Sequence, residues 1–434
     1  MKYCVRCCYP ENARPAIIFD AQGMCSGCRA HEQRQFVNWQ EQHEKLLDIL
    51  RESRVQAKKN NAIYDCIVPV SGGKDSHFQV YYIKKLGFNP LVVSYNHCFN
   101  TALGIRNLTN LVTQFDCNLL RFTSSPGAAK RISKYMLKKI GDITWHYHAG
   151  IMTFPVKAAV MYKIPLIIWG EHGFSDLLGM YSQDDMMEFS KKDRKDHAMR
   201  GIAPEDILND PLNIDITEAD LAPFYYPTDE EIEASGVRGI YLSNFMPWNA
   251  YEQAKLMIEE YNFETAVQRE RTFIRYAKLD DIHANGLHDY LKYLKFGYGR
   301  ATDDASIEIR HGRMTREEAI EMVKKHDHVK PSDMKLWLEF VGMSEDEFYQ
   351  IVEPLRDHKI WTKDTLGNWQ TLDSIMNHVH DSGVKESAIP LIDAPYDLSS
   401  QGRSVYKSDG QIFYPARIDD GRTSLESASA YALL

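Results

Sequence analysis

The pattern of apolar and polar positions changes at about residue 62. From there to about residue 173, short apolar and β-branched runs alternate with longer stretches whose apolar residues recur at helical spacing. The predicted strands are CIVPV (66–70), PLVVSYNH (90–97), CNLLRFTS (117–124) and PLIIWGEHG (165–173). The predicted helices are SHFQVYYIKKLG (76–87), LGIRNLTNLVTQFD (103–116), GAAKRISKYMLKKIGD (127–142) and FPVKAAVMYKI (154–164). This alternation predicts an α/β fold, with a parallel sheet covered by helices on both faces.

The flanking regions show other patterns. Residues 36–61 are largely polar, with apolar residues at roughly helical spacing, which predicts a linking helix. Residues from about 180 to 250 are less regular and rich in charge, Pro and Tyr, and we expect an insertion around a ligand. Later helices are expected at 249–262, 281–297, 315–326 and 344–355, the last two opened by the capping boxes Thr315 with Glu318 and Ser344 with Glu347. The tail after about residue 382 has weak periodicity and is expected to be flexible.

Composition and charge are those of an ordinary globular protein. The 434 residues are 44% hydrophobic and 26% charged, and the length predicts two or three domains. The net charge of −9 lacks the basic excess that a broad nucleic-acid surface needs. No run approaches the roughly 18 apolar residues of a membrane span, and the N-terminus has no apolar signal core. We therefore expect a cytoplasmic protein.

The placement of the cysteines predicts a metal site near the N-terminus. Five of the eight lie in the first 28 residues, whereas a disulfide framework would spread pairs along the chain. Cys4 and Cys7 form one C-x-x-C pair, and Cys25 and Cys28 form a second. The spacing fits a structural zinc ribbon, in which four thiolates leave no open position for catalysis. Cys8 could replace Cys7 as a ligand, and a thiolate-bound iron–sulfur cluster would fit the same spacing.

A glycine-rich turn joins the first predicted strand to its helix. Its residues are Ser71, Gly72, Gly73, Lys74, Asp75 and Ser76. Backbone N–H groups at the mouth of a helix, with glycines that let the chain come close, form an anion site. The turn fits neither the Walker A spacing nor the dinucleotide fingerprint. The alternative is a tight turn in which the glycines only supply a positive φ.

The form S-G-G-x-D-S after a first strand resembles the PP-loop of ATP pyrophosphatases, which have an adenine nucleotide alpha hydrolase-like, Rossmann-like fold. The resemblance implies that the loop holds the β- and γ-phosphates of ATP while AMP is transferred to a substrate oxygen. It also implies that Lys74 neutralises phosphate charge, that Asp75 helps to hold Mg²⁺ and that the loop serines donate hydroxyl hydrogen bonds. By the same resemblance, Ser94 and Tyr95 at the end of the second predicted strand would lie near the adenine.

Another candidate group lies at the end of the fourth predicted strand. The carboxyl ends of parallel strands share one edge of a sheet, so Gly170 and Glu171 should lie beside the glycine-rich turn. Glu171 could complete the Mg²⁺ site or contact the substrate. A solvated loop carboxylate would look the same in the sequence, because a single acid is weak evidence.

A basic stretch between residues 292 and 316 stands out in an acidic chain. Arginine forks recognise anions, so this concentration favours binding of an acidic substrate. The interspersed acids fit an ordinary helix and loop surface equally well. The candidate substrate-binding residues are Lys295, Arg300, Arg310 and Arg313.

The cysteine pairs, PVSGGKDS, WGEHG and KFGYGRATDDASIEIRHGRMTREEA together resemble the N-acetyl sugar amidotransferase family of surface-polysaccharide and flagellin-glycan biosynthesis. The resemblance covers residues 1–331, and the longer C-terminal extension departs from the family. It implies conversion of the acetamido group of an acidic sugar, either a UDP-linked mannuronic-acid type or a nonulosonic acid, into an acetamidino group. The implied cofactors are ATP, Mg²⁺ and structural Zn²⁺. The expected units are a ribbon at 1–35, the linking helix at 36–61, the PP-loop domain at 62–330 and a helical region with a flexible tail at 331–434.

The remaining cysteines bear on the source of ammonia and on the alternative functions. None of Cys66, Cys98 and Cys117 lies in a glycine-flanked nucleophile elbow, so no glutaminase is expected in this chain. The family resemblance implies a HisH-like glutaminase and a HisF-like barrel as partners. A PP-loop tRNA thiolase is the main rival, with Cys98 or Cys117 as sulfur carrier, although the net charge and the absence of an internal C-x-x-C disfavour it. A non-catalytic zinc-ribbon scaffold is the other alternative.

Overall fold

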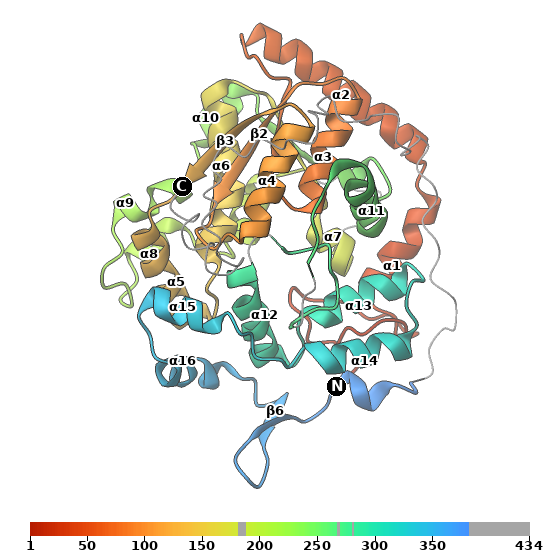
Figure 1. Cartoon of the computed structure of the whole chain (residues 1–434), viewed down its shortest axis with the longest axis vertical. Helices are drawn as coiled ribbons and strands as arrows, with labels where there is room; N and C mark the ends of the chain where they lie inside the picture. The colour runs from red at the N-terminus through yellow and green to blue at the C-terminus, as the bar shows by residue number, and fades with distance from the viewer. Residues whose placement is uncertain (181–187, 267–269, 280–281, 382–434) are drawn as a thin grey trace.

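The computed structural model describes residues 1–180, 188–266, 270–279 and 282–381, and a parallel sheet forms its centre (Figure 1). The five strands lie in the order β3, β2, β1, β4 and β5. They are β1 (Cys66–Pro69), β2 (Pro90–Asn96), β3 (Asn118–Thr123), β4 (Leu166–Trp169) and β5 (Arg238–Tyr241). The helices that connect the first four strands are α3 (Lys74–Lys85), α4 (Ala102–Gln114), α5 (Pro126–Ile140) and α6 (Trp145–Tyr162). This arrangement confirms the expected α/β class.

Side chains on the central strands alternate between two apolar cores. On β1, Val68 packs in the core that α3 covers together with α2 (Trp39–Lys59) and α11 (Ala250–Tyr261). Its neighbour Ile67 packs in the opposite core, which α6 covers together with α10 (Asp229–Ser235). Strands buried on both faces are apolar along their whole length, because neither face meets water. This is why the sequence shows them as short continuous apolar runs.

Two features differ from the sequence pattern. The irregular stretch between residues 180 and 250 contains the edge strand β5, which pairs in parallel with β4. It also contains the short helices α8 (Pro204–Leu208), α9 (Glu218–Leu221) and α10. Helix α6 begins at Trp145 rather than at residue 154 and runs through Pro155. Packing of its first turns, with Trp145 fully buried, outweighs the helix-breaking tendency of the proline.

The rest of the chain after α11 is mainly helical and lies below the sheet in Figure 1. Its elements are α12 (Ile282–Phe296), α13 (Arg300–Arg310), α14 (Arg316–His326), α15 (Met334–Val341), α16 (Glu345–Val352) and the small hairpin of β6 (Trp361–Lys363) and β7 (Trp369–Thr371). Both expected capping boxes form, at the starts of α14 and α16. The tail predicted to be flexible lies outside the described residues. None of the helices in the described ranges combines the length and the apolar character needed to cross a bilayer.

The N-terminal cysteine-rich module shares a core with these later helices. It consists of residues 1–25, α1 (Ser26–Gln33) and the 3₁₀ turn η1 (Arg34–Phe36). Tyr9 and Met24 of the module pack in one apolar cluster with Ile309 of α13 and Ile320 of α14. The short helix α7 (Gly173–Leu178), which follows β4, packs against α1 (Figure 1). The module is thus joined by apolar contacts to both the sheet edge and the C-terminal helices.

Candidate active site and four-cysteine centre

The glycine-rich turn lies between β1 and α3 and is held by hydrogen bonds of its own serines. The backbone N–H of Ser71 donates to Ser76 Oγ at 3.0 Å, and that of Gly73 donates to Ser71 Oγ at 3.2 Å. Gly73 precedes the first turn of the twelve-residue helix α3, and no side chain of the described residues caps that turn. The N-terminal end of a helix therefore meets the carboxyl end of the central strand, which is an arrangement suited to phosphate.

Gly72 is expected to tolerate no side chain. Its φ of 93° is left-handed, and an added Cβ would lie 2.9 Å from the backbone nitrogen of Leu108 on α4. Gly72→Ala should lower the free energy of unfolding by about 1–3 kcal/mol through strain alone, and should also displace the turn and weaken ATP binding. Gly87→Ala is the matched control, because its φ is 80° but an added Cβ would meet no described atom within 4 Å. Denaturant unfolding and nucleotide titration measure both effects, and equal ATP affinities in the two variants would contradict a role of the turn in binding.

Lys74 and Asp75 form an ion pair at the start of α3. Lys74 Nζ lies 2.5 Å from Asp75 Oδ2, and the lysine side chain is only 7% exposed. The other carboxylate oxygen, Asp75 Oδ1, is buried with no hydrogen-bond partner among the described residues. Buried polar atoms are nearly always paired, and Mg²⁺ binds through carboxylate oxygens. The oxygen set of this residue therefore fits a divalent cation bound with phosphate.

Strand β4 brings Glu171 to the same edge of the sheet. The parallel pairing of Ile67 with Ile167 sets the register, so Glu171 leaves the sheet level with Ser71. The residue is exposed at the surface by its accessible area, but the surrounding protein atoms partly desolvate its carboxyl group, and this desolvation, followed by the negative charge of Asp75, raises the pKa of Glu171. The Glu171 carboxyl group is thus within electrostatic reach of the turn.

The three other residues predicted to hold the nucleotide have packing contacts in this structure. An added Cβ on Gly170 would lie 2.0 Å from Gln79 Nε2, so the glycine lets β4 approach α3 closely. Tyr95 is 5% exposed and stacks on Phe122 with ring centroids 6.0 Å apart, and burial raises its pKa. Ser94 lies beside it on β2 and is also buried. Contact of these residues with ATP stays a prediction.

Of the four predicted substrate-binding residues, two lie near Glu171. Arg300 and Arg310 line a cavity of about 130 Å³ that Glu171 also lines. Lys295 lies elsewhere, with its Nζ 3.3 Å from a backbone carbonyl oxygen of α5, and burial lowers its pKa to about 8. Arg313 forms an ion pair of 2.6 Å with a carboxylate of α13 and is not part of the cavity lining.

The cavity also contains basic residues that the sequence did not single out. Arg34 lies in the turn after α1, and Lys278 lies in the loop before α12. Each is a single basic residue in a polar or irregular stretch. A single basic residue forms no periodic pattern and no motif. Only the folded structure therefore shows that these residues lie near the sheet edge that carries the glycine-rich turn.

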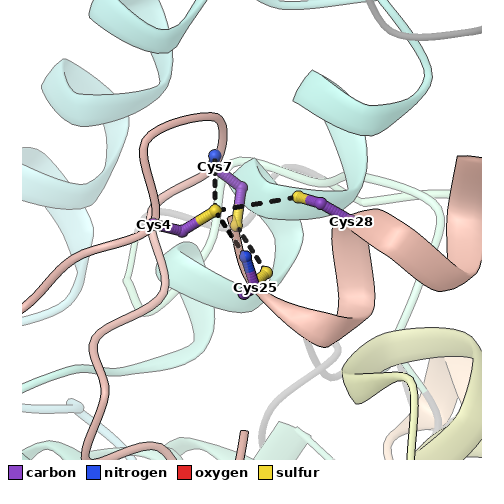
Figure 2. A group of neighbouring side chains, drawn as sticks. All are labelled: Cys4, Cys7, Cys25 and Cys28. Carbon is purple, nitrogen blue, oxygen red and sulfur yellow. Dashed lines mark hydrogen bonds between the residues drawn. The ribbon is translucent and has the colours of Figure 1, made fainter. Parts of the chain in front are cut away.

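Four cysteine sulfur atoms converge in the N-terminal module (Figure 2). Those of Cys4, Cys7, Cys25 and Cys28 lie within 4.8 Å of one another, and all four residues are buried. Cys8 is not part of the group, and its backbone N–H donates to a serine hydroxyl of α13 at 3.2 Å. A set of four thiolates fits tetrahedral zinc, and the donor set also suits iron. The structure groups Cys7 rather than Cys8 with the other three.

Arg310 lies directly against this four-cysteine centre. Its Nη2 is 3.7 Å from Cys25 Sγ and 4.0 Å from Cys7 Sγ, and its Nη1 donates to the carbonyl oxygen of Leu177 at 2.6 Å. The residue is 2% exposed. A zinc ion with four thiolates carries two negative charges, so a buried guanidinium beside it stabilises the bound state. Arg310 therefore lies between the metal centre and the cavity.

The fold and these two centres define the class of protein as an α/β protein with a parallel sheet, a glycine-rich turn at the start of α3 and a buried four-cysteine centre that could hold a metal ion. Residues 254–376 match the family described as LPS biosynthesis protein WbpG-like, C-terminal domain. This part of the chain is thus similar to that C-terminal domain, in agreement with the resemblance to polysaccharide-biosynthesis proteins. The matched segment begins in α11 and includes α12 to α16, and with them Arg300, Arg310 and Arg313.

Similar solved structures share only part of the fold. The NH3-dependent NAD synthetase from Campylobacter jejuni subsp. jejuni NCTC 11168, in complex with the nitrate ion, is 16% identical with a TM-score of 0.24, over 34% of this chain and 62% of that chain. The NMN synthetase from Francisella tularensis is 12% identical with a TM-score of 0.24, over 46% of this chain and 93% of that chain. With scores this low, neither structure bears on the activity of this chain. No curated protein matches the sequence significantly.

Proposed function

We propose that the chain is the synthetase subunit of an ATP-dependent amidotransferase that converts the acetamido group of an acidic N-acetyl sugar into an acetamidino group. The sugar is of the UDP-linked mannuronic-acid type or a nonulosonic acid. The observation that carries the proposal is the turn at residues 71–76, at the carboxyl edge of the sheet. A buried lysine lies there, together with a helix start and a carboxylate oxygen for which the described residues provide neither a side-chain cap nor a hydrogen-bond donor. The match of residues 254–376 to a lipopolysaccharide-biosynthesis domain supports a sugar as the acceptor.

The chemistry begins with activation of a poor electrophile. The acetamide oxygen attacks the α-phosphorus of ATP, the bond from that phosphorus to the bridging oxygen breaks, and pyrophosphate leaves. Ammonia then adds to the amide carbon of the adenylated imidate. The carbon–oxygen bond breaks, AMP carries the oxygen away, and an amidinium group remains. No covalent intermediate with the protein is needed.

Each residue of the turn has a role in this scheme. Lys74 offsets the charge that grows on the departing pyrophosphate, and backbone N–H groups at the start of α3 bind its oxygens. Asp75 would hold Mg²⁺, which supplies further charge neutralisation when bound. Glu171 lies level with the turn and contacts the substrate. The cysteine centre has a structural role, because a site with four thiolates has no open position.

Ammonia is supplied by a partner in this proposal. The three cysteines outside the N-terminal module are Cys66, buried in β1, and Cys98 and Cys117, which are partly buried. Burial raises the pKa of all three thiols, which disfavours a nucleophilic thiolate. A HisH-like glutaminase with a HisF-like barrel that conducts ammonia completes the enzyme.

Mass spectrometry of the sugar tests the proposal. Candidate acidic N-acetyl sugars are incubated with the protein, ATP, Mg²⁺ and ammonium chloride. Replacement of oxygen by NH lowers the mass of the product by about one unit, a change fixed by the atoms exchanged. Formation of AMP without any such product, with every acidic sugar tried, would contradict the assigned acceptor.

A tRNA thiolase would need a reactive cysteine, and the pKa values of the two candidate thiols distinguish this function from the proposed one. Burial raises the pKa of Cys98, and it raises that of Cys117 to about 12. Cys98→Ser and Cys117→Ser should therefore keep AMP formation within about twofold of the unchanged protein, since neither thiol is a thiolate at neutral pH. Loss of AMP formation in either variant, with an unchanged melting temperature, would favour the thiolase.

A further inference from the structure

A cavity lies beside the carboxyl edge of the sheet, and its walls come from three parts of the chain that are distant in sequence. Its volume is about 130 Å³. One wall comes from α1 and η1 of the cysteine-rich module, a second from Glu171 and α7, and a third from α13. Trp248 and Lys278 close the remaining sides. We call this space the interdomain cavity.

The interdomain cavity adjoins the glycine-rich turn. Glu171 lines it and leaves the sheet level with Ser71. Trp248, another lining residue, packs edge-on against Phe78 of α3, with ring centroids 5.9 Å apart. A ligand in the cavity would therefore lie close to the place where α3 presents its N-terminal end.

The lining combines apolar side chains with charged groups that come from separate segments. Arg34, Lys278, Arg300 and Arg310 contribute four guanidinium or ammonium groups, against three carboxylates from Glu171, Asp303 and Asp304. Two of these acids are already bound by lysine, because Lys292 contacts Asp303 at 2.7 Å and Lys278 contacts Asp304 at 2.7 Å.

Two imidazole rings add hydrogen-bonding groups to this lining. His31 of α1 and His311, which follows α13, meet edge to face with centroids 4.8 Å apart. Burial, followed by His31 and then the nearby arginines, lowers the pKa of His311 to about 2, so the His311 ring is neutral. A lining of cations, carboxylates and a neutral imidazole suits a ligand with one negative charge and several hydroxyl or amide groups.

The size of the interdomain cavity limits what it can hold. An engineered protein cavity of about 150 Å³ holds one benzene molecule. A space of about 130 Å³ is smaller than that, so it can enclose only one end of an acidic sugar, its carboxylate with the adjacent ring atoms, while the rest of the sugar extends out of the opening. Any nucleotide carrier would have to extend out of the cavity.

We propose that the interdomain cavity is part of the acceptor subsite, that it binds the carboxylate-bearing end of the acidic acetamido sugar, and that Arg34 of the cysteine-rich module and Lys278 recognise this carboxylate. This inference rests on the proposed function and extends it to residues of the N-terminal module. The metal centre then has a defined purpose, because it fixes the start of α1 and, through Arg310, the facing wall formed by α13. ATP and the acceptor meet at Glu171.

Calorimetric titration of the full chain tests this subsite, with N-acetylneuraminic acid as the acidic probe and N-acetylglucosamine as the uncharged probe. Arg34→Gln and Lys278→Gln should each weaken binding of the acidic probe by about ten- to a hundredfold, the range for loss of a hydrogen bond between charged groups. Binding of the uncharged probe should be weak and should not change in either variant. Lys324→Gln, on the exposed face of α14, is the matched control and should bind like the unchanged protein. A crystal soaked with the acidic probe should show it between α1 and α13.

The outcomes separate this inference from the proposed function. If the acidic probe binds but Arg34→Gln and Lys278→Gln bind it as Lys324→Gln does, the cavity assignment is wrong while an acidic acceptor stands. If neither probe binds while ATP does, both the subsite and the acidic acceptor are wrong. Zinc content and melting temperature identify variants that fail to fold, and for such a variant the soaked crystal of the unchanged protein decides.

Discussion

Lys74→Ala is expected to lower AMP formation by about a hundred- to a thousandfold, the usual effect of removing one preorganised electrostatic group from a reacting oxyanion. The lysine is buried at the start of α3 and pairs with Asp75, so its charge is aimed at the mouth of the turn. Asp75→Asn should cause a loss of similar size, because the amide cannot replace a carboxylate as an Mg²⁺ ligand. Thin-layer separation of labelled nucleotides measures AMP directly.

The matched control for Lys74 is Lys84→Ala at the other end of the same helix. Lys84 Nζ contacts a backbone carbonyl oxygen at 3.0 Å, far along α3 from the turn. This variant removes the same side chain from the same element and should keep full activity. Equal rates for Lys74→Ala and Lys84→Ala, in folded protein, would contradict the role assigned to the turn.

Removal of one cluster thiolate is expected to destabilise much more than the N-terminal module. Cys7→Ala should reduce the zinc content to near zero, because a structural site needs all four ligands. Structural zinc contributes about 10–16 kcal/mol to the folding of small zinc modules, and here the module shares its core with α13 and α14. We therefore expect a large fall in melting temperature together with increased protease cleavage in those helices.

Cys8→Ala provides the control for this loss. Cys8 is as buried as Cys7 but lies outside the four-cysteine group. Its replacement should keep one zinc per chain and should cost about 1 kcal/mol of stability, as for an ordinary buried substitution. Zinc measured with a chromogenic chelator would contradict the ligand set if Cys8→Ala lost the metal and Cys7→Ala kept it. Iron in place of zinc would appear as visible absorption.

The sequence predicts the sheet well because its physical signal is strong. Strands β1, β2 and β4 are buried along almost their whole length, so each is a largely apolar run bounded by polar residues or glycine, whereas the edge strand β3 is partly exposed. Strand β5 was missed because its four residues, RGIY, begin with an arginine and a glycine and lie within a charged and irregular stretch. The equally short strands β1 and β4 are apolar throughout, so their composition marks them although they are too short to show periodicity.

Helix α13 shows a different limit. Its buried positions include Thr302, Asp303, Asp304, Glu308 and Arg310, so polar and charged residues occupy much of the surface that packs against the rest of the protein. Charged groups at these positions are compensated by partners on other elements. The basic residues of this stretch were therefore predicted as substrate ligands, although the structure places Arg310 against two cysteine sulfur atoms that are 285 and 303 residues away in sequence. Pairing over that distance cannot be inferred from a single sequence.

The residues of the candidate site also form two groups, those that the sequence predicted and those that only the folded structure brings together. Local motifs identified the turn and the cysteine pairs, because in each case the chemistry lies within a few consecutive residues. The interdomain cavity was not predicted, because its residues come from α1, the end of β4 and α13. Only the register of β1 with β4 and the packing of α1 on α7 bring them to one place.

The most direct test of adenylation at this turn uses ATP that carries ³²P on the α-phosphate. The labelled products are identified after reaction with an acidic N-acetyl sugar and ammonium. We expect AMP to be the labelled nucleotide product and pyrophosphate to form in equal amount. Label in ADP, with release of orthophosphate, would show cleavage at the terminal phosphate and would contradict adenylation of an amide oxygen at this turn.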